Sequence, residues 1–488
     1  MEYNNFTRKT AAGLIREYNR IPFEPKHIHL MGICGTAMAS LAGILKEEGY
    51  HVTGSDENVY PPMSLLLWEM GIKIIKGYSE NNLESVPDLV IVGNVITAKN
   101  PEAIKLSKLK IPYISLPQAL RRFAIGDKKS IVISGTHGKS TTSAICAWML
   151  EKAGVDPGYM IGGVLNNFKS NFKLGRGAYY VIEGDEYDTA FFDKGPKFLH
   201  YAPFITVITS IEFDHADIYR DLDHVISSFR KLIEIIPENG LLIANGDDPI
   251  VLEESERAKC PVKLYGFSDG LHWRAVNVEN STDGTSVRIL NNGKEYLKVF
   301  GTLYGNHNIS NLLSVIALSE YIGLKKDAVR DAVRTFKGVK RRQEIRGEEN
   351  GILVLDDFAH HPTAVEKTVE AVKDRYKERR LAAVFEPRSN SSRRGIFQER
   401  YSMVFDPADL VFIPEPPMMD KVPENNRFSS AKLVETLRDR DIDAYYCSTN
   451  DQLLEEILNK IRPGDVVLIM SNGSFDNIHE RLLERLKN

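Results

Sequence analysis

A glycine-rich turn between a predicted strand and a predicted helix constrains this chain more than any other feature. The apolar run at residues 131–133 leads into SGTHGKSTT at 134–142, and a helical pattern follows. At such a turn backbone amides point inward, the helix N-terminus adds partial positive charge, a lysine reaches outer phosphates and a serine hydroxyl can hold Mg²⁺. The alternative is an ordinary glycine turn. The predicted phosphate-binding residues are Gly135, Thr136, His137, Gly138, Lys139, Ser140 and Thr141.

The turn is a compact variant of the usual phosphate-binding loop. The spacing G-x-x-x-x-G-K-[ST] would require glycine at Ile133, whereas the first glycine here is Gly135. This difference narrows the class of nucleotide-binding protein to which the chain can belong.

The composition is that of a large globular protein. Hydrophobic residues make up 43% of the 488 residues, and a formal net charge of -4 provides no basic surface for nucleic acid. The four cysteines lie far apart, which argues against a zinc knuckle or a disulfide framework. No apolar run approaches the roughly 18 residues of a membrane span, and the first residues do not form a leader peptide. We therefore expect a cytoplasmic protein, monomeric or weakly dimeric, that binds neither nucleic acid nor membrane.

Alternating strand and helix patterns divide the chain into three α/β units. Within the middle unit, residues 270–300 alternate apolar and polar side chains around Asn291-Asn292-Gly293, which predicts an antiparallel hairpin in a β subdomain. The expected divisions are an extension at residues 1–26, a first domain at 27–126, a central domain at 127–340 and a third domain at 341–488.

Two acidic segments follow the phosphate loop, each at the end of a predicted strand. Glu183 ends the strand at 179–182, and His215 lies in EFDHAD at 212–217, after the strand at 205–208. Ligands gather at the carboxyl ends of strands in α/β folds, and Mg²⁺ prefers one or two carboxylates together with phosphates and waters. For Asp188 and Asp217, capping of the following helices is an equally good interpretation. Ser140, Glu183 and His215 are the candidate metal ligands.

Further polar residues cluster near the boundary with the third domain. Asn308 and Asn311 lie one turn apart at a predicted helix start, where they could contact a base edge or simply cap the helix. Arg342 and the segment 356–362, DDFAHHP, flank the boundary and could bring a second domain onto a nucleotide. A charged hinge is the alternative interpretation for these residues.

The first domain opens with a second glycine turn. Gly32 and Gly35 follow the strand at 27–31, and Asp56 ends the next strand. The spacing lacks the G-x-G start of a dinucleotide fingerprint, which disfavours NAD and an oxidoreductase. A glycine turn at a helix N-terminus still suits a diphosphate, and the Asp56 carboxylate could meet a ribose or a base.

In this order, the motifs resemble the Mur ligase superfamily, whose ATP-dependent enzymes join an amino acid or peptide to UDP-N-acetylmuramic acid derivatives. The resemblance runs from about residue 27 to the C-terminus and implies an N-terminal Rossmann-like UDP-binding domain, a central P-loop ATPase-like domain and a C-terminal Rossmann-like domain. The segments that carry it are GTHGKS at 135–140, EGDE at 183–186, DH at 214–215, GNHNISN at 305–311, RRQE at 341–344 and DFAHHP at 357–362.

The resemblance implies a mechanism and a site. The lactyl carboxylate of the sugar would attack the γ-phosphate of ATP to give an acyl phosphate, which an amine then attacks. Mg²⁺, or alternatively Mn²⁺, would be held by Ser140 and Glu183, and His215 would hold a second ion that bridges acyl and phosphoryl oxygens. The implied catalytic residues are Lys139, Glu183, His215 and Arg342. The implied ATP-binding residues are the phosphate loop from Gly135 to Thr141 with Asn308, Asn311, Arg342, Asp357 and His360. The implied UDP-sugar-binding residues are Gly32, Cys34, Gly35, Thr36, Ala37, Met38, Asp56 and Asn94.

Several stretches resemble the branch of the family that adds a peptide in peptidoglycan recycling. They include GICGT at 32–36, DEYDTAFFDK at 185–194 and EPRSN at 386–390. This branch uses the tripeptide L-alanyl-γ-D-glutamyl-meso-diaminopimelate. The alternative is the branch that adds L-alanine, which usually has Gly-Ile-Gly-Gly in the front turn and a different segment at 386–390. As in that alternative branch, no lysine closely follows Asp214-His215, so we do not predict a carbamylated lysine.

The incoming peptide carries carboxylates, so it would need cations on the third domain. The alternative is that the arginines of this loop form a solvated face. A further hypothesis, from a different functional class, is a sensor that binds UDP-sugar or ATP without chemistry; Lys139, Ser140, Glu183 and His215 together argue against it. The candidate peptide-binding residues are Arg388, Ser389, Asn390, Arg393, Ser471 and Asn472, with Arg394 nearby.

Overall fold

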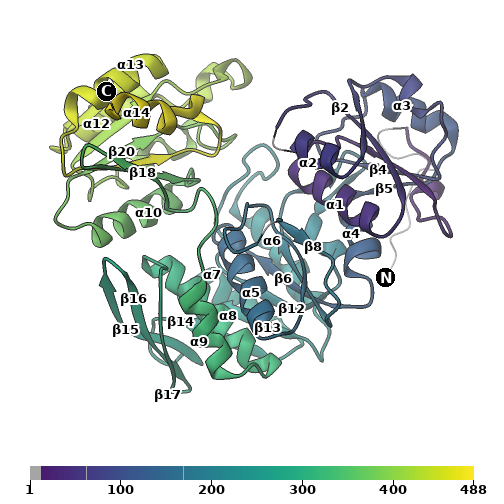
Figure 1. The fold of residues 1–488 in the computed structure, drawn as a ribbon, viewed down its shortest axis with the longest axis horizontal. Coiled ribbons are helices and arrows are strands. Elements are labelled where there is room, and N and C mark those ends of the chain that lie inside the picture. The colour runs from purple at the N-terminus through teal and green to yellow at the C-terminus, as the bar shows by residue number, and fades with distance from the viewer. Residues whose placement is uncertain (1–12, 62, 169, 488) are drawn as a thin grey trace.

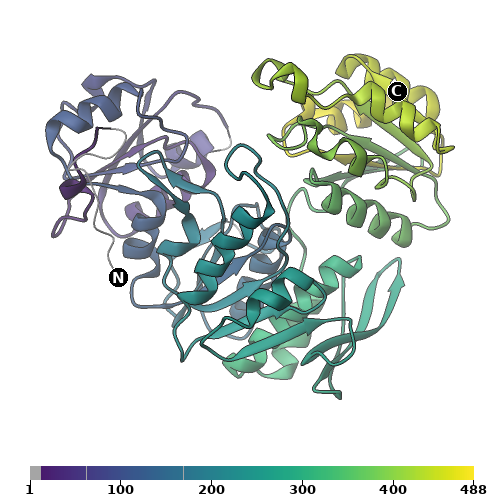
Figure 2. The ribbon, with the colours of Figure 1, turned by 180° about the vertical axis from the view of Figure 1, so that it is seen from behind.

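The computed structural model describes residues 13–61, 63–168 and 170–487. They form three α/β regions, with the N-terminal and C-terminal regions on either side of the central one (Figure 1). The view from behind shows the same order (Figure 2). This three-domain α/β architecture confirms the fold class predicted from the sequence. Among the described residues, no helix is both long enough and apolar enough to cross a membrane.

The N-terminal region is a parallel five-stranded sheet in the order β3-β2-β1-β4-β5. All four residues of β4 are buried, as expected for a parallel strand covered on both faces. Strand order reverses between β1 and β4, and ligands bind at such a crevice in open α/β sheets. The strands are β1 (His27–Met31), β2 (His51–Asp56), β3 (Lys73–Lys76), β4 (Leu89–Val92) and β5 (Tyr113–Ser115). The helices are α1 (Thr36–Glu47), α2 (Met63–Glu69), α3 (Pro101–Leu109), α4 (Leu116–Leu120) and the short η1 (Arg16–Tyr18), η2 (Glu80–Leu83) and η3 (Arg121–Ile125).

Part of the predicted N-terminal extension packs onto this region. Residues 1–12 lie outside the described residues, but Leu14 is buried in a cluster with Tyr113. The Asn19 side chain donates to the Tyr113 carbonyl at 3.0 Å. The described end of the extension therefore adds to the first domain.

The central region is built on a ten-stranded sheet in the order β17-β16-β15-β14-β13-β12-β6-β9-β7-β8. The strand that precedes the phosphate loop, β6, lies between β12 and β9, so the loop emerges in the middle of the sheet. The strands are β6 (Lys129–Ser134), β7 (Gly158–Met160), β8 (Phe172–Lys173), β9 (Tyr179–Gly184), β12 (Pro203–Ile208), β13 (Leu241–Asn245), β14 (Val262–Gly266), β15 (Trp273–Ser281), β16 (Gly284–Asn291) and β17 (Lys294–Gly301), with the separate hairpin β10 (Asp188–Ala190) and β11 (Asp193–Pro196). The helices are α5 (Lys139–Lys152), α6 (Leu222–Glu234), α7 (Pro249–Ser255), α8 (Asn306–Ile322), α9 (Lys326–Thr335) and η4 (Lys197–His200).

The β subdomain predicted at residues 270–300 is an antiparallel meander that extends the main sheet. Strand β15 pairs in parallel with β14 through Tyr265 and Trp273, and β16 and β17 follow in antiparallel order. The hairpin between β16 and β17 turns at Asn292 and Gly293, which have φ of 48° and 77°. Asparagine and glycine tolerate this left-handed backbone, which explains the pattern at this turn.

The C-terminal region is a six-stranded sheet in the order β18-β19-β23-β20-β21-β22, with only β18 antiparallel to its neighbour among the described pairings. Two apolar clusters cover its two faces. The strands are β18 (Glu344–Glu349), β19 (Ile352–Asp357), β20 (Leu381–Phe385), β21 (Leu410–Pro414), β22 (Ala444–Cys447) and β23 (Val466–Met470). The helices are α10 (Pro362–Arg375), α11 (Gln398–Tyr401), α12 (Ser430–Arg438), α13 (Asn450–Lys460), α14 (Ile478–Lys487) and the short η5 (Gly395–Phe397), η6 (Met419–Lys421), η7 (Glu424–Asn426) and η8 (Phe475–Asn477).

The two junctions of the central region differ in chemistry. A single apolar cluster runs from the N-terminal region into the central one, where Phe172 packs closely against Gly43 of α1. The C-terminal region instead meets the central one through polar contacts. Ser391 Oγ donates to Asp214 Oδ1 at 2.6 Å, and Thr363 Oγ1 donates to Glu212 Oε2 at 2.6 Å. The first junction therefore buries a continuous apolar cluster, whereas the second combines hydrogen bonds with apolar packing of Phe213 on the C-terminal core.

Candidate active site

The phosphate loop joins β6 to α5 and lies against the end of β12. A Cβ atom at Gly135 would lie 2.0 Å from Thr209 Oγ1, and one at Gly138 would lie 2.5 Å from Asn311 Oδ1. Both glycines also have positive φ, 133° and 82°. Only glycine fits these two positions, so the compact spacing of the motif follows from the close approach of β12 and α8.

Ser140 and Glu183 place two oxygen ligands side by side at the start of α5. Ser140 Oγ donates to Glu183 Oε2 at 2.9 Å, and the Gly162 amide donates to Glu183 Oε1 at 2.6 Å. Burial, with the nearby charge of Asp185, raises the pKa of Glu183. A divalent cation would reverse this effect and favour the carboxylate. A hydroxyl and a carboxylate in contact fit a Mg²⁺ site that phosphates and water complete.

His215, the predicted ligand of a second metal ion, lies against Glu186. His215 Nε2 lies 3.3 Å from Glu186 Oε1, and Lys139 Nζ lies 3.0 Å from Glu186 Oε2. Burial opposes the charge of Glu186, but Lys139 and His215 outweigh it and lower its pKa to about 2. Glu186 is thus a carboxylate shared by two cations. We did not predict its role, although its place in EGDE next to Glu183 was the available signal.

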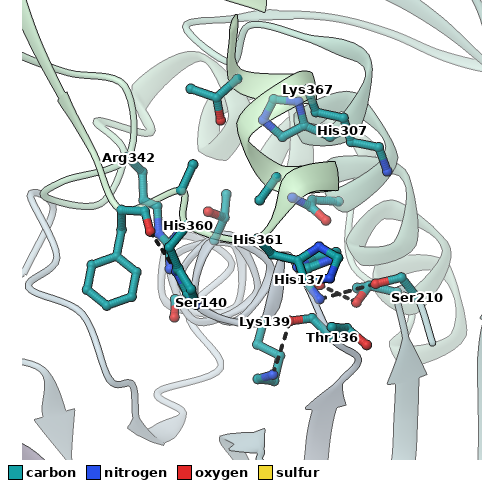
Figure 3. Close-up of a pocket in the computed structure, with 18 of the residues that line it drawn as sticks. Thr136, His137, Lys139, Ser140, Ser210, His307, Arg342, His360, His361 and Lys367 are labelled. Atoms are coloured by element: carbon teal, nitrogen blue, oxygen red, sulfur yellow. Dashed lines mark hydrogen bonds between the residues drawn. The ribbon is translucent and has the colours of Figure 1, made fainter. Parts of the chain in front are cut away.

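A cavity of about 420 Å³ opens above the phosphate loop, between the central and C-terminal regions. Figure 3 shows Thr136, His137, Lys139 and Ser140 on one side and Arg342, His360 and Lys367 on the other. Gly135, which was predicted to bind ATP, does not line this cavity. The lining also includes residues that were not predicted, namely Ser210, Asn245, His307, Phe358 and His361. The predicted ATP residues that line it are Thr136, His137, Gly138, Lys139, Ser140, Thr141, Asn308, Asn311, Arg342, Asp357 and His360.

Several of these lining residues also hold the walls of the cavity. Asn308 Nδ2 donates to the Tyr304 carbonyl at 2.9 Å, and Asn311 Nδ2 lies 3.5 Å from Asn308 Oδ1. Asp357 accepts from the Gln343 amide at 2.8 Å and from the Ala359 amide at 2.7 Å. Asp357 therefore fixes the hinge beside Arg342 through backbone amides, and its role toward a nucleotide stays a prediction.

A second cavity, of about 300 Å³, lies between the front glycine turn and the central region. Asp56 does not line it but accepts from the Cys34 amide and the Asn58 amide, each at 2.9 Å, and so holds the turn. Gly32 and Cys34 also lie outside its lining, whereas Lys197, which we did not predict, lies within it. The predicted UDP-sugar residues that line it are Gly35, Thr36, Ala37, Met38 and Asn94.

The two cavities meet at the acidic segment after β9. Asp185 and Tyr187 line both, and Glu183 lines the second while accepting from Ser140 in the first. Lys197 Nζ lies 3.2 Å from Asp185 Oδ2 and 4.1 Å from the centre of the Tyr187 ring. Two small molecules bound in these cavities would therefore have their ends next to Glu183.

The candidate peptide-binding residues are spread over one loop and its neighbour, and only Asn472 lines the first cavity. Arg393 is buried and donates to the Met418 carbonyl at 2.9 Å and to Asn390 Oδ1 at 2.7 Å. Asn390 also donates across the domain junction to Asp217 at 2.9 Å. Arg388 Nη1 lies 3.4 Å from Glu386, its one hydrogen-bond partner among the described residues.

The remaining members of this group hold their loops together. Ser389 Oγ donates to Ser392 Oγ at 2.9 Å, and the buried Ser471 hydroxyl donates to Glu386. Asn472 Oδ1 is buried with no hydrogen-bond partner among the described residues, and its side chain lines the cavity. Asn472 and Arg388 are therefore the two candidates whose polar atoms are best placed for a ligand.

The sequence of this chain matches three models of one protein family. Residues 27–128 match the Mur ligase family catalytic domain, residues 133–319 the Mur ligase middle domain, and residues 341–473 the Mur ligase glutamate ligase domain. The chain belongs to the Mur ligase family.

Individual relatives cover nearly the whole chain. It is 40% identical to UDP-N-acetylmuramate–L-alanyl-γ-D-glutamyl-meso-2,6-diaminoheptandioate ligase of Escherichia coli K12, over 94% of this chain and 98% of that one. It is 32% identical to UDP-N-acetylmuramate–L-alanine ligase of Alkaliphilus metalliredigens, over 96% and 99%. The crystal structure of a murein peptide ligase from Psychrobacter arcticus superposes with a TM-score of 0.69 at 34% identity, over 95% and 99%.

Proposed function

We propose that this chain is an ATP-dependent ligase that joins the tripeptide L-alanyl-γ-D-glutamyl-meso-diaminopimelate to UDP-N-acetylmuramate. The observation that carries the proposal is the meeting of the two cavities at Asp185 and Tyr187, beside the contact between Ser140 and Glu183. A ligase of this kind must bring a nucleotide phosphate to a sugar carboxylate. Cavities that share a wall at a cation-binding pair of oxygens satisfy that requirement.

In the proposed reaction, a carboxylate oxygen of the sugar attacks the γ-phosphorus of ATP. The bond to the bridging oxygen breaks, which leaves ADP and an acyl phosphate. The peptide amine then attacks the acyl carbon, phosphate departs and the amine releases a proton. Lys139 would stabilise the charge on the transferred phosphoryl group, and Arg342 would contact the phosphates from the hinge. Mg²⁺ held by Ser140 and Glu183 would supply further neutralisation of phosphate charge.

The choice of amine is supported by the relatives and by the third domain. The E. coli relative, at 40% identity, is named for the tripeptide, whereas the relatives named for L-alanine among those compared are 30% to 34% identical. Arg388 packs on Gly473, next to the cavity-lining Asn472, and offers a cation for a peptide carboxylate. The alternative is the L-alanine ligase of peptidoglycan synthesis. A non-catalytic sensor is disfavoured because Lys139, held by Glu186, and Ser140, held by Glu183, both face the first cavity.

We further propose that the enzyme is a cytoplasmic monomer that recycles cell-wall peptides. All four cysteines are free thiols, which suits a reducing compartment. The role in recycling rests on the proposed reaction, because it requires the tripeptide as substrate.

One assay tests the proposal against its alternatives. Phosphate release from ATP is measured with UDP-N-acetylmuramate and either L-alanine or the tripeptide. We expect turnover with the tripeptide and little with L-alanine. Preferred turnover with L-alanine would overturn the peptide assignment, and no turnover with either amine would favour the sensor.

A further inference from the structure

Three potential metal ligands from separate segments converge where the C-terminal region meets the phosphate loop. His137 lies in the loop, Glu212 follows β12, and His361 precedes α10. Their ligand atoms all lie within 4.8 Å of one another. His137 Nε2 and His361 Nδ1 each lie 3.7 Å from Glu212 Oε2. Figure 3 shows the two imidazoles side by side, and their ring centres are 4.6 Å apart.

The hydrogen bonds of His361 prepare its Nδ1 atom as a ligand. His361 Nε2 lies 3.2 Å from the Phe213 carbonyl, which can only accept, so the ring proton is on Nε2. The lone pair of Nδ1 accepts a long bond, 3.3 Å, from the Thr363 amide, and a metal ion on Nδ1 would replace this bond. A histidine whose other nitrogen donates to a backbone carbonyl is the usual arrangement of a metal-binding imidazole.

The other two atoms are also poised to donate electron pairs. His137 Nε2 is buried and has no hydrogen-bond partner among the described residues. The Glu212 carboxylate accepts from Thr363 Oγ1 at 2.6 Å through Oε2, the oxygen that lies nearest both imidazoles. Neutral imidazole and ionised carboxylate are the forms that bind metal.

We propose that His137, Glu212 and His361 form a transition-metal site, for an ion such as Zn²⁺ or Co²⁺, that fastens the C-terminal region to the phosphate loop. Two imidazoles and one carboxylate suit Zn²⁺ and its neighbours, whereas Mg²⁺ prefers oxygen alone. With bonds of about 2.0–2.1 Å, ligands of a tetrahedral ion lie roughly 3.4 Å apart. The two 3.7 Å separations from Glu212 therefore need small shifts, whereas the two imidazole nitrogens, which lie within 4.8 Å of each other, would have to approach further.

This site is separate from the Ser140–Glu183 pair and acts on it indirectly. His137 lines the first cavity, so a metal held there would compete with a nucleotide for that wall. His361 belongs to the other region, so the same ion would also resist separation of the two regions. A bound metal ion would thus act as a brake on the enzyme, which here means that it inhibits the reaction by weakening ATP binding and holding the two regions together. The braking role rests on the proposed function, whereas metal binding itself does not.

Binding of Co²⁺ to the full chain, in saturating Mg²⁺ and without ATP, tests the site through visible absorption and titration calorimetry. We expect one four-coordinate Co²⁺ per chain. His361→Asn, which keeps a capping side chain for α10, and Glu212→Gln should each weaken binding by at least about tenfold, because even loss of an outer partner costs roughly 10–100-fold. Unchanged Co²⁺ affinity in both variants would overturn the proposal.

Two more variants distinguish this site from its surroundings. His215→Gln should keep the Co²⁺ affinity of the wild type. Loss of Co²⁺ binding in this variant would mean that the ion binds at His215 instead, and would overturn the proposal. Arg400 Nη1 lies 3.7 Å from the same Glu212 oxygen on a side chain that is 53% exposed. Arg400→Ala should therefore tighten Co²⁺ binding a few-fold, because a competing cation is removed, and weaker binding would contradict the site.

The brake has its own readout. Bound Zn²⁺ should weaken ATP binding to the wild-type chain by at least about tenfold, and His361→Asn should abolish this effect. ATP affinity that ignores Zn²⁺ while Co²⁺ still binds would overturn the brake. Failure of ATP to bind at all, with the Co²⁺ signal intact, would instead count against the proposed function.

Discussion

The phosphate loop at residues 135–140 and the loop at 386–394 both follow a buried strand, and both carry cations, but they use them differently. Lys139 bonds to Glu186, and its side chain lines the cavity. Arg393 is buried in its own loop and donates to the Ser389 and Met418 carbonyls and to Asn390. Lys139 Nζ also donates to the Gly135 carbonyl at 2.6 Å, so both cations stabilise their own loops. Of the two, Lys139 lines the cavity, and a cation at the end of a strand is therefore a site candidate when it faces a cavity.

The two cations also differ in electrostatic setting. Burial disfavours the charge of Lys139, but the carboxylates of Glu186, Asp185 and Glu183 raise its pKa overall. Burial lowers the pKa of Arg393, and the neighbouring Arg388 adds to that effect. Lys139 therefore lies among carboxylates, and a bound phosphate would have to replace them as its partners. Arg393 is instead held by neutral oxygens.

Removal of the Lys139 ammonium is the strongest test of this difference. Lys139→Ala should reduce ATP-dependent phosphate release by roughly 10²–10³-fold, the usual loss when one stabilising group for developing charge is removed. Binding of the UDP-sugar, measured by calorimetry, should stay unchanged, because the second cavity does not include Lys139. Lys108→Ala, at an exposed ion pair, is the matched control. Activity that survives Lys139→Ala would show that the loop has another role.

Arg393→Ala should affect folding instead. The substitution leaves the Met418 and Ser389 carbonyls without their partner and removes buried packing, which should cost about 2 kcal/mol of unfolding free energy. Differential scanning calorimetry should show the C-terminal transition lowered by roughly 5 °C. At permissive temperature, KM for the peptide should change little. An unchanged transition with a large rise in that KM would mean that Arg393 binds the peptide after all.

The same contrast explains how much of the site the sequence could predict. The phosphate loop is one contiguous motif, so Lys139 and Ser140 could be assigned from spacing, and the α/β order of strands and helices predicted three domains correctly. Glu212 and Lys197, whose positions depend on contacts between distant segments, gave no such signal. Glu212 meets Thr363 across 151 positions, and Lys197 reaches the second cavity only because η4 folds beside Tyr187.

Loops that stabilise themselves are the hardest to interpret from sequence. Arginines at 388, 393 and 394 are equivalent in a sequence pattern, but burial and the Met418 carbonyl separate Arg393 from Arg388. The Asn308 and Asn311 pair is similar, because Asn311 packs on Gly138 and so also shapes the loop. Side-chain packing, which no local pattern encodes, decides between these roles.

Arg388, in the loop at 386–394, provides a test with a smaller expected effect. If its available donors bind a peptide carboxylate, Arg388→Ala should lower kcat/KM for the tripeptide about tenfold, near 1.4 kcal/mol, with little change in thermal stability. A Cβ atom at Gly473 would lie 2.3 Å from Arg388 Cδ, so Gly473→Ala should displace the guanidinium and lower kcat/KM similarly. Normal peptide kinetics in both variants would remove Arg388 from the binding site.

The smallest expected effect is a pH dependence of stability around the phosphate loop. Burial lowers the pKa of His215, but its hydrogen bond to Glu186 outweighs this and raises it above 6.5. The folded state thus favours protonated His215, so its stabilising contribution is complete below pH 6.5 and is lost as the pH rises through the raised pKa. The difference in urea midpoint between wild type and His215→Gln should therefore shrink from pH 6 to pH 9.

His272 provides a control of opposite sign for this pH effect. Burial lowers its pKa, and its Nδ1 accepts from the Leu264 amide at 3.1 Å, so the folded state favours the neutral ring. Its contribution is present above pH 6.5 and is lost as the pH falls through the lowered pKa. The deficit of His272→Gln should therefore shrink on acidification. Equal pH trends for the two variants would show that a general charge effect, rather than the Glu186 pair, controls stability beside the loop.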